Sequence, residues 1–581
     1  MGKKSTVALL LILALGIFLR FFQFTALPPG LYPDEAMNGS NALEAIHTDT
    51  YKLFYPENNG REGLFINIQA LSIWLFGNTS WALRFVSAIF GILTILGVYL
   101  VAKELFMPSP RHPEHIRFAQ YKLREGSREN SEGFGIPRGA CPEGIRRARN
   151  DEIFGISSGK VIALLSAFFI ATSYWHLHFS RMGFRAISLP FFAVFGIYFL
   201  LRGIRRSTVS DIVLGGIFTG LGFHTYIAFR FMPLVLAPPL LLYLSRWWHS
   251  RGITVSTKLK SACAPCVVTL FIFAVFITAL PIGWYFLHNP ADFIGRGGQL
   301  SIFSADAPAR EFAIANLKTV GMFFVRGDCN PRHNYNCLPE LNPIVALFFL
   351  IGIIRALRQL FGRNAGPHLR MASLTLLSWL AFMSLGVTLT REGLPHALRA
   401  IGMIPPALIL AGWGGAVCLQ KLLAGAKKLS DKDKRRRGMR RRIIGFAVLL
   451  ATIPLFTFYS YFVLWGTSAA ARDAFAADIT HLGMYLAALP PETEKYIIVQ
   501  EGDFFVRVQT VMYLTDTYED VKRAARHTHY VPLSQLDMIA SAPSILIAPL
   551  NQSDIEEVRT FIAKKFPALR MAIPGDFTIF K

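Results

Sequence analysis

The sequence predicts a mainly α protein: a polytopic membrane bundle of about eleven helical spans plus an interfacial helix, followed by a small C-terminal α/β domain. Among its 581 residues, 52% are hydrophobic, 17% are charged and 49 are Phe, a composition typical of a membrane protein. Apolar runs close to or above the roughly 18–20 residues that cross a bilayer recur as far as Trp465. The net charge of +23 is concentrated in short loops between these runs, which indicates a positive-inside orientation rather than nucleic-acid binding.

The N-terminus is expected in the cytoplasm, because Lys3 and Lys4 precede the first apolar run. No signal-peptidase site follows that run, so it is expected to remain as a helix. If each later run crosses once, the chain alternates between the two faces and the C-terminus lies outside. The expected spans are residues 7–24, 82–106, 159–175, 186–201, 212–225, 231–244, 263–287, 343–360, 371–389, 400–419 and 443–465. This assignment places the segment 421–442, with eleven Lys and Arg, inside.

Three long connections interrupt the membrane domain, residues 1–466. Residues 25–81 form an outer catalytic loop, residues 107–157 a cytoplasmic insertion rich in Pro, Gly, Arg and Glu, and residues 288–342 another outer loop. Within the first of these, Leu64–Phe76 is apolar but only about thirteen residues long, near 20 Å as a helix and too short to span. This helix is therefore expected to lie in the membrane interface or to re-enter it.

Residues 467–581 mix charged residues with short apolar runs and are expected to form a soluble α/β domain outside the membrane. Residues 496–500 and 544–548 read as strands, and residues 553–565 read as a helix with a Ser cap and early acidic residues. No Gly-rich nucleotide-binding motif occurs there, so no chemistry is assigned to this domain.

The stretch Leu27-Pro-Pro-Gly-Leu-Tyr-Pro-Asp-Glu35 holds the candidate catalytic residues, Asp34 and Glu35. Its three prolines prevent the first helix from continuing and fix the chain as it leaves the bilayer. An acid held beside the membrane can take a proton from an acceptor while the other substrate stays anchored in lipid. The alternative is that both acids are solvated loop residues that cap the following helix.

Positive charge also gathers on the outer connections, against the usual orientation bias. The arginines selected as candidate phosphate ligands are Arg61, Arg181, Arg185, Arg230 and Arg399. Isolated arginines at helix ends often reach lipid headgroups, which is the alternative for each. Together, however, they share a face with Asp34, and guanidinium groups match phosphate oxygens. A phosphate leaving group and a carboxylate base indicate group transfer from a lipid-carried donor, because nucleotide sugars are cytoplasmic.

The six cysteines show no repeated metal-type spacing, which argues against a disulfide framework or a zinc site. Cys329 and Cys337 lie in an outer loop where a disulfide is permitted. Cys263 and Cys266 begin an apolar run and are expected as buried thiols.

Four short motifs carry a family resemblance: Pro33-Asp-Glu35, Gly60-Arg-Glu-Gly-Leu64, Leu75-Phe-Gly77 and Trp81-Ala-Leu-Arg84. With this order and spacing the chain resembles the C-type integral-membrane glycosyltransferases, the group that includes protein O-mannosyltransferases and the lipid A aminoarabinose transferase. The resemblance covers roughly residues 1–240, and the later part mainly through topology.

The resemblance implies a polyprenyl- or dolichyl-phosphate sugar donor and inverting transfer to a hydroxyl of a protein, lipid or glycan at the outer face of the plasma (inner) membrane, with no role for nucleic acid. It implies Asp34 as the base, with Glu35 beside it, and Arg61 as a contact of the carrier phosphate, although Glu62 and Gly63 replace two prolines of the family. Where many relatives have a second acid, this chain has Arg185-Ala-Ile-Ser188. No cofactor is assigned with certainty. A divalent metal, as in related oligosaccharyltransferases, is left open, and no metal ligand is assigned.

Two other functions remain open from the sequence. A secondary transporter would have paired repeats and interrupted helices at the membrane midplane, whereas the charges here cluster at the outer edge. A polymerase or ligase of lipid-linked polysaccharide shares the topology and the basic outer loops, but does not need Asp-Glu after its first span.

Overall fold

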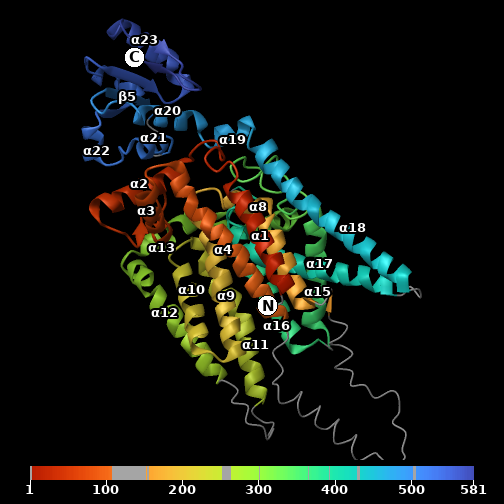
Figure 1. Cartoon of the computed structure of the whole chain (residues 1–581). Helices are drawn as coiled ribbons and strands as arrows, with labels where there is room; N and C mark the ends of the chain where they lie inside the picture. Colours follow the sequence, from red (N-terminus) through yellow and green to blue (C-terminus); the bar gives the residue numbers. More distant parts are fainter. Residues whose placement is uncertain are drawn as a thin grey trace, which may run out of the picture.

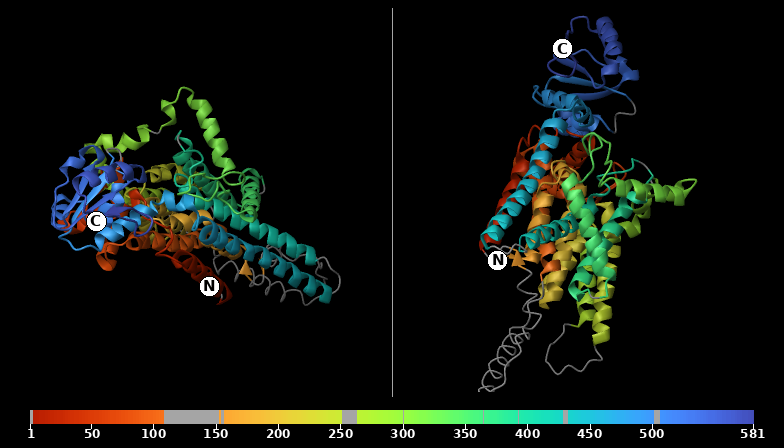
Figure 2. Two further views of the ribbon diagram at one scale, coloured as in Figure 1. Left: turned by 90° about the horizontal axis from the view of Figure 1, so that it is seen from above. Right: turned by 90° about the vertical axis from the view of Figure 1, so that its right-hand side faces the viewer.

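The computed structural model describes residues 3–107, 152–153, 156–250, 263–299, 301–363, 365–391, 393–427, 432–500 and 506–581. Long helices form one bundle, and residues 467–581, the C-terminal segment, cover one end of it (Figure 1). That end is called the capped end below. The N-terminal helix α1 (Lys3–Phe21) begins at the opposite end, as two further views also show (Figure 2).

Within the described residues, nine helical stretches are long and apolar enough to cross a membrane, and the chain is an integral membrane protein. Seven of them form or include α1, α4 (Ser80–Phe106), α9 (Ser188–Arg206), α11 (Met232–Ser250), α12 (Ala264–His288), α15 (Pro343–Phe361) and α16 (Pro367–Thr388). The other two include α17 (Ile404–Lys427) and α18 (Lys432–Phe458), which continues as the π-helix η5 (Tyr459–Trp465). Short 3-10 turns lead into three of these helices: η1 (Arg185–Ile187), η2 (Ile227–Phe231) and η4 (Ile401–Met403).

The two remaining expected spans correspond to shorter helices, α7 (Ser158–Ala171) and α10 (Val209–Gly222), of 14 residues each. Helix α7 stops because Ser173 caps a separate helix, α8 (Tyr174–Phe179), by accepting a hydrogen bond from the His176 amide at 3.3 Å. Both short helices pack inside the bundle, α7 against α4 and α17, and α10 against α9 and α12.

Close helix contacts form the core of the bundle. At the crossing of α15 and α17, a Cβ on Gly352 would overlap the Leu410 carbonyl oxygen, and a Cβ on Gly414 would overlap that of Phe348. Small residues on both helices therefore allow the backbones to touch, as is common where membrane helices associate by packing.

The basic segment 421–442 is helical on both sides of residues 428–431, which lie outside the described residues. Helix α18 already begins at Lys432, because Lys and Arg are good helix formers and the segment contains one Gly and no Pro after Lys427. Most of the expected insertion 107–157 also lies outside the described residues. Its end forms a short antiparallel pair, β3 (Glu152–Ile153) with β4 (Ile156–Ser157).

At the capped end, residues 25–81 fold as α2 (Pro33–Thr48), the antiparallel pair β1 (Phe54–Tyr55) and β2 (Arg61–Glu62), and α3 (Leu64–Phe76). Helix α3 has the predicted bounds. It buries Phe65 and Ile66 and exposes Leu71 and Trp74, as expected for a helix at an interface. Residues 288–342 contain α13 (Pro290–Gln299), η3 (Ile302–Ser304) and α14 (Pro308–Gly321).

The C-terminal segment contains a five-stranded mixed sheet in the order β6-β5-β7-β9-β8. Strand β5 is parallel to β6 and β7, whereas β9 is antiparallel to β7 and β8. The strands are β5 (Glu494–Val499), β6 (Thr528–Pro532), β7 (Ile545–Pro549), β8 (Met571–Ala572) and β9 (Ile579–Phe580). The α-helices are α19 (Ala469–Ala474), α20 (Ala477–Ala487), α21 (Val508–Thr515), α22 (Asp520–Ala525) and α23 (Ile555–Lys565). Two 3-10 helices, η7 (Leu533–Met538) and η8 (Gln552–Asp554), complete the segment. The two predicted strands and the predicted helix are present as β5, β7 and α23. Helix α19 follows the end of α18, and α21 packs against α2 (Figure 1).

Candidate active site

A cavity of about 500 Å³ opens at the capped end, where α2, β2, η1, η2 and α16 approach one another. Of the five predicted phosphate ligands, Arg61, Arg185, Arg230 and Arg399 line it together with Asp34. Most of the remaining wall is apolar and includes Phe184, Ala186, Tyr226, Ile227, Ala228, Phe231, Phe293, Phe303, Leu385, Leu389 and Leu398. A charged region and an apolar wall therefore meet in one space.

Asp34 occupies the first turn of α2, directly after Pro33 at the start of the helix. Its carboxylate is half-buried, and Oδ1 accepts a hydrogen bond of 2.8 Å from the Asn58 side-chain amide. It is the acidic side chain among the described residues that line the cavity. A single positioned carboxylate can accept a proton from a hydroxyl group that enters the cavity.

Arg61 lies at the start of β2 and is 3% exposed. Its guanidinium donates to the side-chain oxygen of Asn38 at 2.7 Å and to that of Asn41, both on α2. Burial, and then the nearby Arg185, lower the pKa of Arg61 to about 10, so the group is charged at neutral pH. Arg61 Nη2 also lies 3.7 Å from Glu57 Oε2, so that carboxylate offsets part of the positive charge that Arg61 brings to the cavity.

Arg185 and Arg230 share Glu62 as an ion-pair partner. Arg185 Nε lies 3.7 Å from Glu62 Oε2, and Arg230 Nη2 lies 3.5 Å from Oε1. Arg230 also stacks on Phe293, with Cζ 4.2 Å from the ring centroid. The Glu62 side chain is 3% exposed, so one buried carboxylate holds two cavity arginines in place.

Two further cationic or titratable residues line the cavity and were not selected from the sequence: Arg332 and His396. Arg332 stacks on Tyr32, with Cζ 4.2 Å from the ring centroid, only two residues before Asp34. Arg399 donates to the Thr390 hydroxyl at 2.9 Å. Among the described residues, the cavity thus brings five arginines around one aspartate.

Glu35 points away from the cavity and is fully buried. Its two oxygens accept hydrogen bonds from Nε and Nη2 of Arg84, both at 3.0 Å. Oε1 also accepts a hydrogen bond of 2.5 Å from the Gly183 amide. The same carboxylate accepts the Tyr32 amide at 3.1 Å. Adjacent residues on a helix differ in direction by about 100°, so α2 sends Asp34 and Glu35 to different surroundings.

Arg181 also lies outside the cavity. Its guanidinium donates to four backbone carbonyls at the end of the first helix and beyond, those of Leu19, Arg20, Gln23 and Leu27, at 2.6–3.1 Å. Helix ends leave carbonyl groups without intrahelical partners. Arg181 supplies those partners, and the geometry therefore gives it contacts with the chain just before Asp34 rather than with the cavity.

Asp328, His333 and His396 are the described residues whose side chains are close enough together to hold a metal ion, with ligand atoms within 4.8 Å of one another. Asp328 Oδ2 already accepts from His333 Nδ1 and from the Ala397 amide, both at 2.8 Å. Arg332 Nε lies 3.2 Å from His333 Nε2. In this arrangement the group links the loop around Asp328 to the segment 396–399, and a metal would have to displace those hydrogen bonds.

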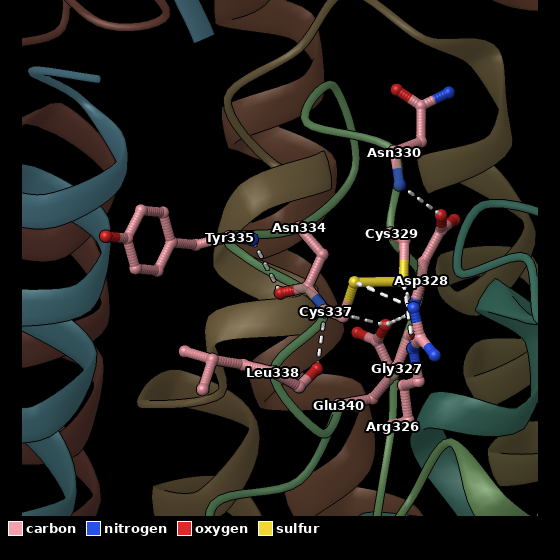
Figure 3. The surroundings of a disulfide bond; sticks show 10 residues. All are labelled: Arg326, Gly327, Asp328, Cys329, Asn330, Asn334, Tyr335, Cys337, Leu338 and Glu340. Carbon is pink, nitrogen blue, oxygen red and sulfur yellow. Dashed lines mark hydrogen bonds between the residues drawn. A yellow bond between two sulfur atoms is a disulfide. The ribbon is translucent and has the colours of Figure 1, made fainter. Parts of the chain in front are cut away.

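A disulfide joins Cys329 to Cys337 beside this group, as the sequence permitted (Figure 3). Glu340 lies under the loop, where it accepts the Asp328 amide at 3.0 Å, and burial raises the pKa of Glu340 well above its ordinary value. A second disulfide joins Cys263 to Cys266, so the expectation of buried free thiols there is wrong. The two Cα atoms are 5.1 Å apart on the first turn of α12, which is within disulfide reach.

The chain is similar to known proteins over a short stretch of its sequence and in its fold. A sequence model of the family described as dolichyl-phosphate-mannose-protein mannosyltransferase matches residues 64–110. Two crystal structures of ArnT from Cupriavidus metallidurans align with this chain, and each alignment covers 100% of this chain and 98% of the ArnT chain. The one bound to undecaprenyl phosphate gives a TM-score of 0.52 at 13% identity, and the apo form gives 0.51 at 12%. The chain has the fold of ArnT.

The predicted resemblance to C-type membrane glycosyltransferases is thereby confirmed at the level of the fold. The oligosaccharyltransferase of Archaeoglobus fulgidus, crystallised with Zn and sulfate, aligns with a TM-score of 0.44 at 14% identity, over 91% of this chain and 62% of that one. A comparison with curated protein sequences gave no match.

Proposed function

We propose that this protein is a membrane glycosyltransferase that moves a sugar from a polyprenyl- or dolichyl-phosphate donor to a hydroxyl acceptor outside the cytoplasm. The observation that carries the proposal is the single cavity in which Asp34 meets Arg61, Arg185, Arg230 and Arg399. ArnT, whose fold this chain shares, was crystallised with undecaprenyl phosphate. A lipid-linked phosphate is the kind of group that several arginines bind, and the apolar wall suits its hydrocarbon chain.

In the proposed reaction, the donor phosphate lies against the arginines and the acceptor hydroxyl lies against Asp34. The hydroxyl oxygen forms a bond to the anomeric carbon while the bond from that carbon to the phosphate oxygen breaks. Asp34 takes the hydroxyl proton, and the carrier phosphate leaves with the bonding electron pair. The arginines stabilise the negative charge that develops on the phosphate. One displacement of this kind inverts the configuration at the anomeric carbon.

We assign the capped end to the outer face of the plasma (inner) membrane. If the nine long stretches and the two 14-residue helices α7 and α10 each cross once, the chain crosses eleven times and its termini lie on opposite faces; in our assignment the N-terminus is in the cytoplasm and the C-terminal segment is outside. The basic start of α18 lies at the end opposite the C-terminal segment (Figure 2), in agreement with the positive-inside tendency. The cavity then faces the compartment in which a lipid-carried sugar is the available donor.

A transfer assay tests the proposal. The purified protein is placed in liposomes with polyprenyl-phosphate donors that carry a radiolabelled sugar, and protein, lipid and glycan acceptors are supplied separately. The expected result is label on one acceptor class, with release of polyprenyl phosphate. Asp34→Asn serves as the inactive control. A polysaccharide polymerase or ligase would use a diphosphate-linked glycan instead, and a transporter would move the donor without breaking its sugar–phosphate bond; either result would overturn the proposal.

A further inference from the structure

The C-terminal segment holds the backbone of the loop that leads to Asp34. The Leu31 amide donates to the Thr480 hydroxyl at 2.8 Å, and the Leu31 carbonyl accepts from the Thr510 hydroxyl at 2.9 Å. Leu31 and Thr510 are fully buried, and Thr480 is 6% exposed. One threonine from α20 and one from α21 thus satisfy both backbone groups of a residue three positions before Asp34.

Packing at the neighbouring residue is equally close. A Cβ on Gly30 would overlap the Phe475 carbonyl oxygen and would lie 2.7 Å from the Ala477 Cα. The backbone at Gly30 therefore rests directly on the turn between α19 and α20, which leaves no space for the loop to move in that direction.

Helix α4 also holds this loop. Arg84 donates to the Pro28 carbonyl at 3.0 Å and to the Gly30 carbonyl, in addition to its pair with Glu35. Tyr513 of the C-terminal segment contacts both α2 and the start of α4: its ring packs on Gly39, and its hydroxyl donates to the carbonyl of Thr79, the residue that caps α4, at 3.1 Å. The segment before Asp34 is consequently clamped between the bundle and the C-terminal segment.

We propose that Thr480 and Thr510 are positioning residues for Asp34, and that the C-terminal segment supports the active site through these two residues rather than being an independent module. This inference rests on the proposed function. It follows from how short the connection is: only Tyr32 and Pro33 lie between Leu31 and Asp34, and the ring of Pro33 fixes its φ angle. A shift at Leu31 is passed on to the Asp34 carboxylate, and a displacement of about 1 Å can cost about 10²-fold in rate.

The test compares kinetic constants with local backbone exchange. In Thr480→Val/Thr510→Val, the shape of both side chains is nearly kept while both hydroxyl groups are lost. We expect kcat to fall roughly 10- to 100-fold, the KM for the lipid donor to stay close to wild type, and hydrogen exchange of the peptide that contains residues 31–35 to become faster. The single variant Thr510→Val should show the same changes to a smaller extent.

Two controls separate positioning from general stability. Thr480→Ser/Thr510→Ser keeps both hydroxyl groups and should retain most of the wild-type kcat. Thr515→Val removes another buried hydroxyl of α21, one that bonds to the Val511 carbonyl at 2.7 Å and to Thr517 within the C-terminal segment, and should leave kcat unchanged. Wild-type kcat in the folded double Val variant, an equal loss in Thr515→Val, or no rescue by Ser would each overturn the inference.

Failure of this inference can be distinguished from failure of the proposed function. If the wild-type protein transfers sugar and Asp34→Asn does not, while the Thr variants remain fully active, only the positioning role is wrong. If the wild-type protein transfers no sugar from any polyprenyl-phosphate donor, the proposed function itself is wrong, and the inference falls with it.

Discussion

Glu35 and Arg84 form a buried two-point ion pair, with Nε and Nη2 each 3.0 Å from a different carboxylate oxygen. Removing one partner of such a pair leaves a buried charge alone, which typically costs about 3–5 kcal/mol. We therefore expect Arg84→Ala to lower the free energy of unfolding by about that amount, measured by thermal or denaturant melting in detergent. Arg559→Ala, at the pair with Glu556 in which both side chains are exposed (59% and 79%), should cost only about 0–1 kcal/mol. Equal losses in both variants would contradict a structural role for the Glu35–Arg84 pair.

Asp34→Asn tests the proposed base. Asparagine keeps the size and the hydrogen bond with Asn58 but cannot take a proton, so turnover should fall roughly 10²- to 10⁴-fold with donor binding nearly unchanged. Asp49→Asn is a matched control: Asp49 lies at the other end of α2, with φ of 51°, a conformation that Asn tolerates well. Turnover near the wild-type level in well-folded Asp34→Asn protein would remove Asp34 from the mechanism.

Alanine at Arg61, Arg185, Arg230 or Arg399 should weaken binding of the polyprenyl-phosphate carrier. A hydrogen bond to a charged group is worth about 1.5–3 kcal/mol, which corresponds to a roughly 10- to 100-fold higher dissociation constant. The measurement is binding of polyprenyl phosphate to each purified variant. If all four variants bind the carrier as tightly as the wild type, the cavity is not its phosphate site.

Arg181→Ala should behave differently from those four. Because Arg181 donates to backbone carbonyls of residues 19–27, its loss should lower thermal stability while the folded fraction still binds the carrier normally. A selective loss of carrier binding at unchanged stability would restore Arg181 to the phosphate site.

Labelling of single cysteines tests the orientation. In a background without other accessible thiols, a cysteine at Asp520, whose side chain is 93% exposed, should react with a membrane-impermeant reagent added outside. A cysteine at Arg436 should react only after the membrane is permeabilised. The reverse pattern would place the cavity in the cytoplasm, where the proposed lipid-carried donor would not be required.

Several features of the fold and of the site could be predicted because they depend on local sequence. The bounds of α3 follow from an apolar run between Gly63 and Gly77, and Asp34 and Arg61 meet because both belong to residues 25–81. The different directions of Asp34 and Glu35 depend on α2 beginning at Pro33, which moves both acids from a loop into the first helical turn.

Other features depend on contacts between distant parts of the chain. The carbonyl partners of Arg181 are more than 150 residues away in the sequence, and no periodicity indicates them. Arg332 and His396 enter the cavity from two different loops that a hydrogen-bonded group around Asp328 joins. Only the fold selects Arg332 among the basic residues of the outer loop 288–342.

The Leu31–Thr480 contact has a consequence for biosynthesis, because 449 residues separate the two partners in the sequence. At about 5–20 residues per second, a ribosome finishes Thr480 roughly 20–90 s after Leu31. By the end of that time the nascent chain carries Asp34 and the arginines of the cavity, but until then the Leu31 amide has no Thr480 hydroxyl to bind. If Thr480 and Thr510 position Asp34 as proposed, the site reaches full activity only after roughly the last hundred residues have been made.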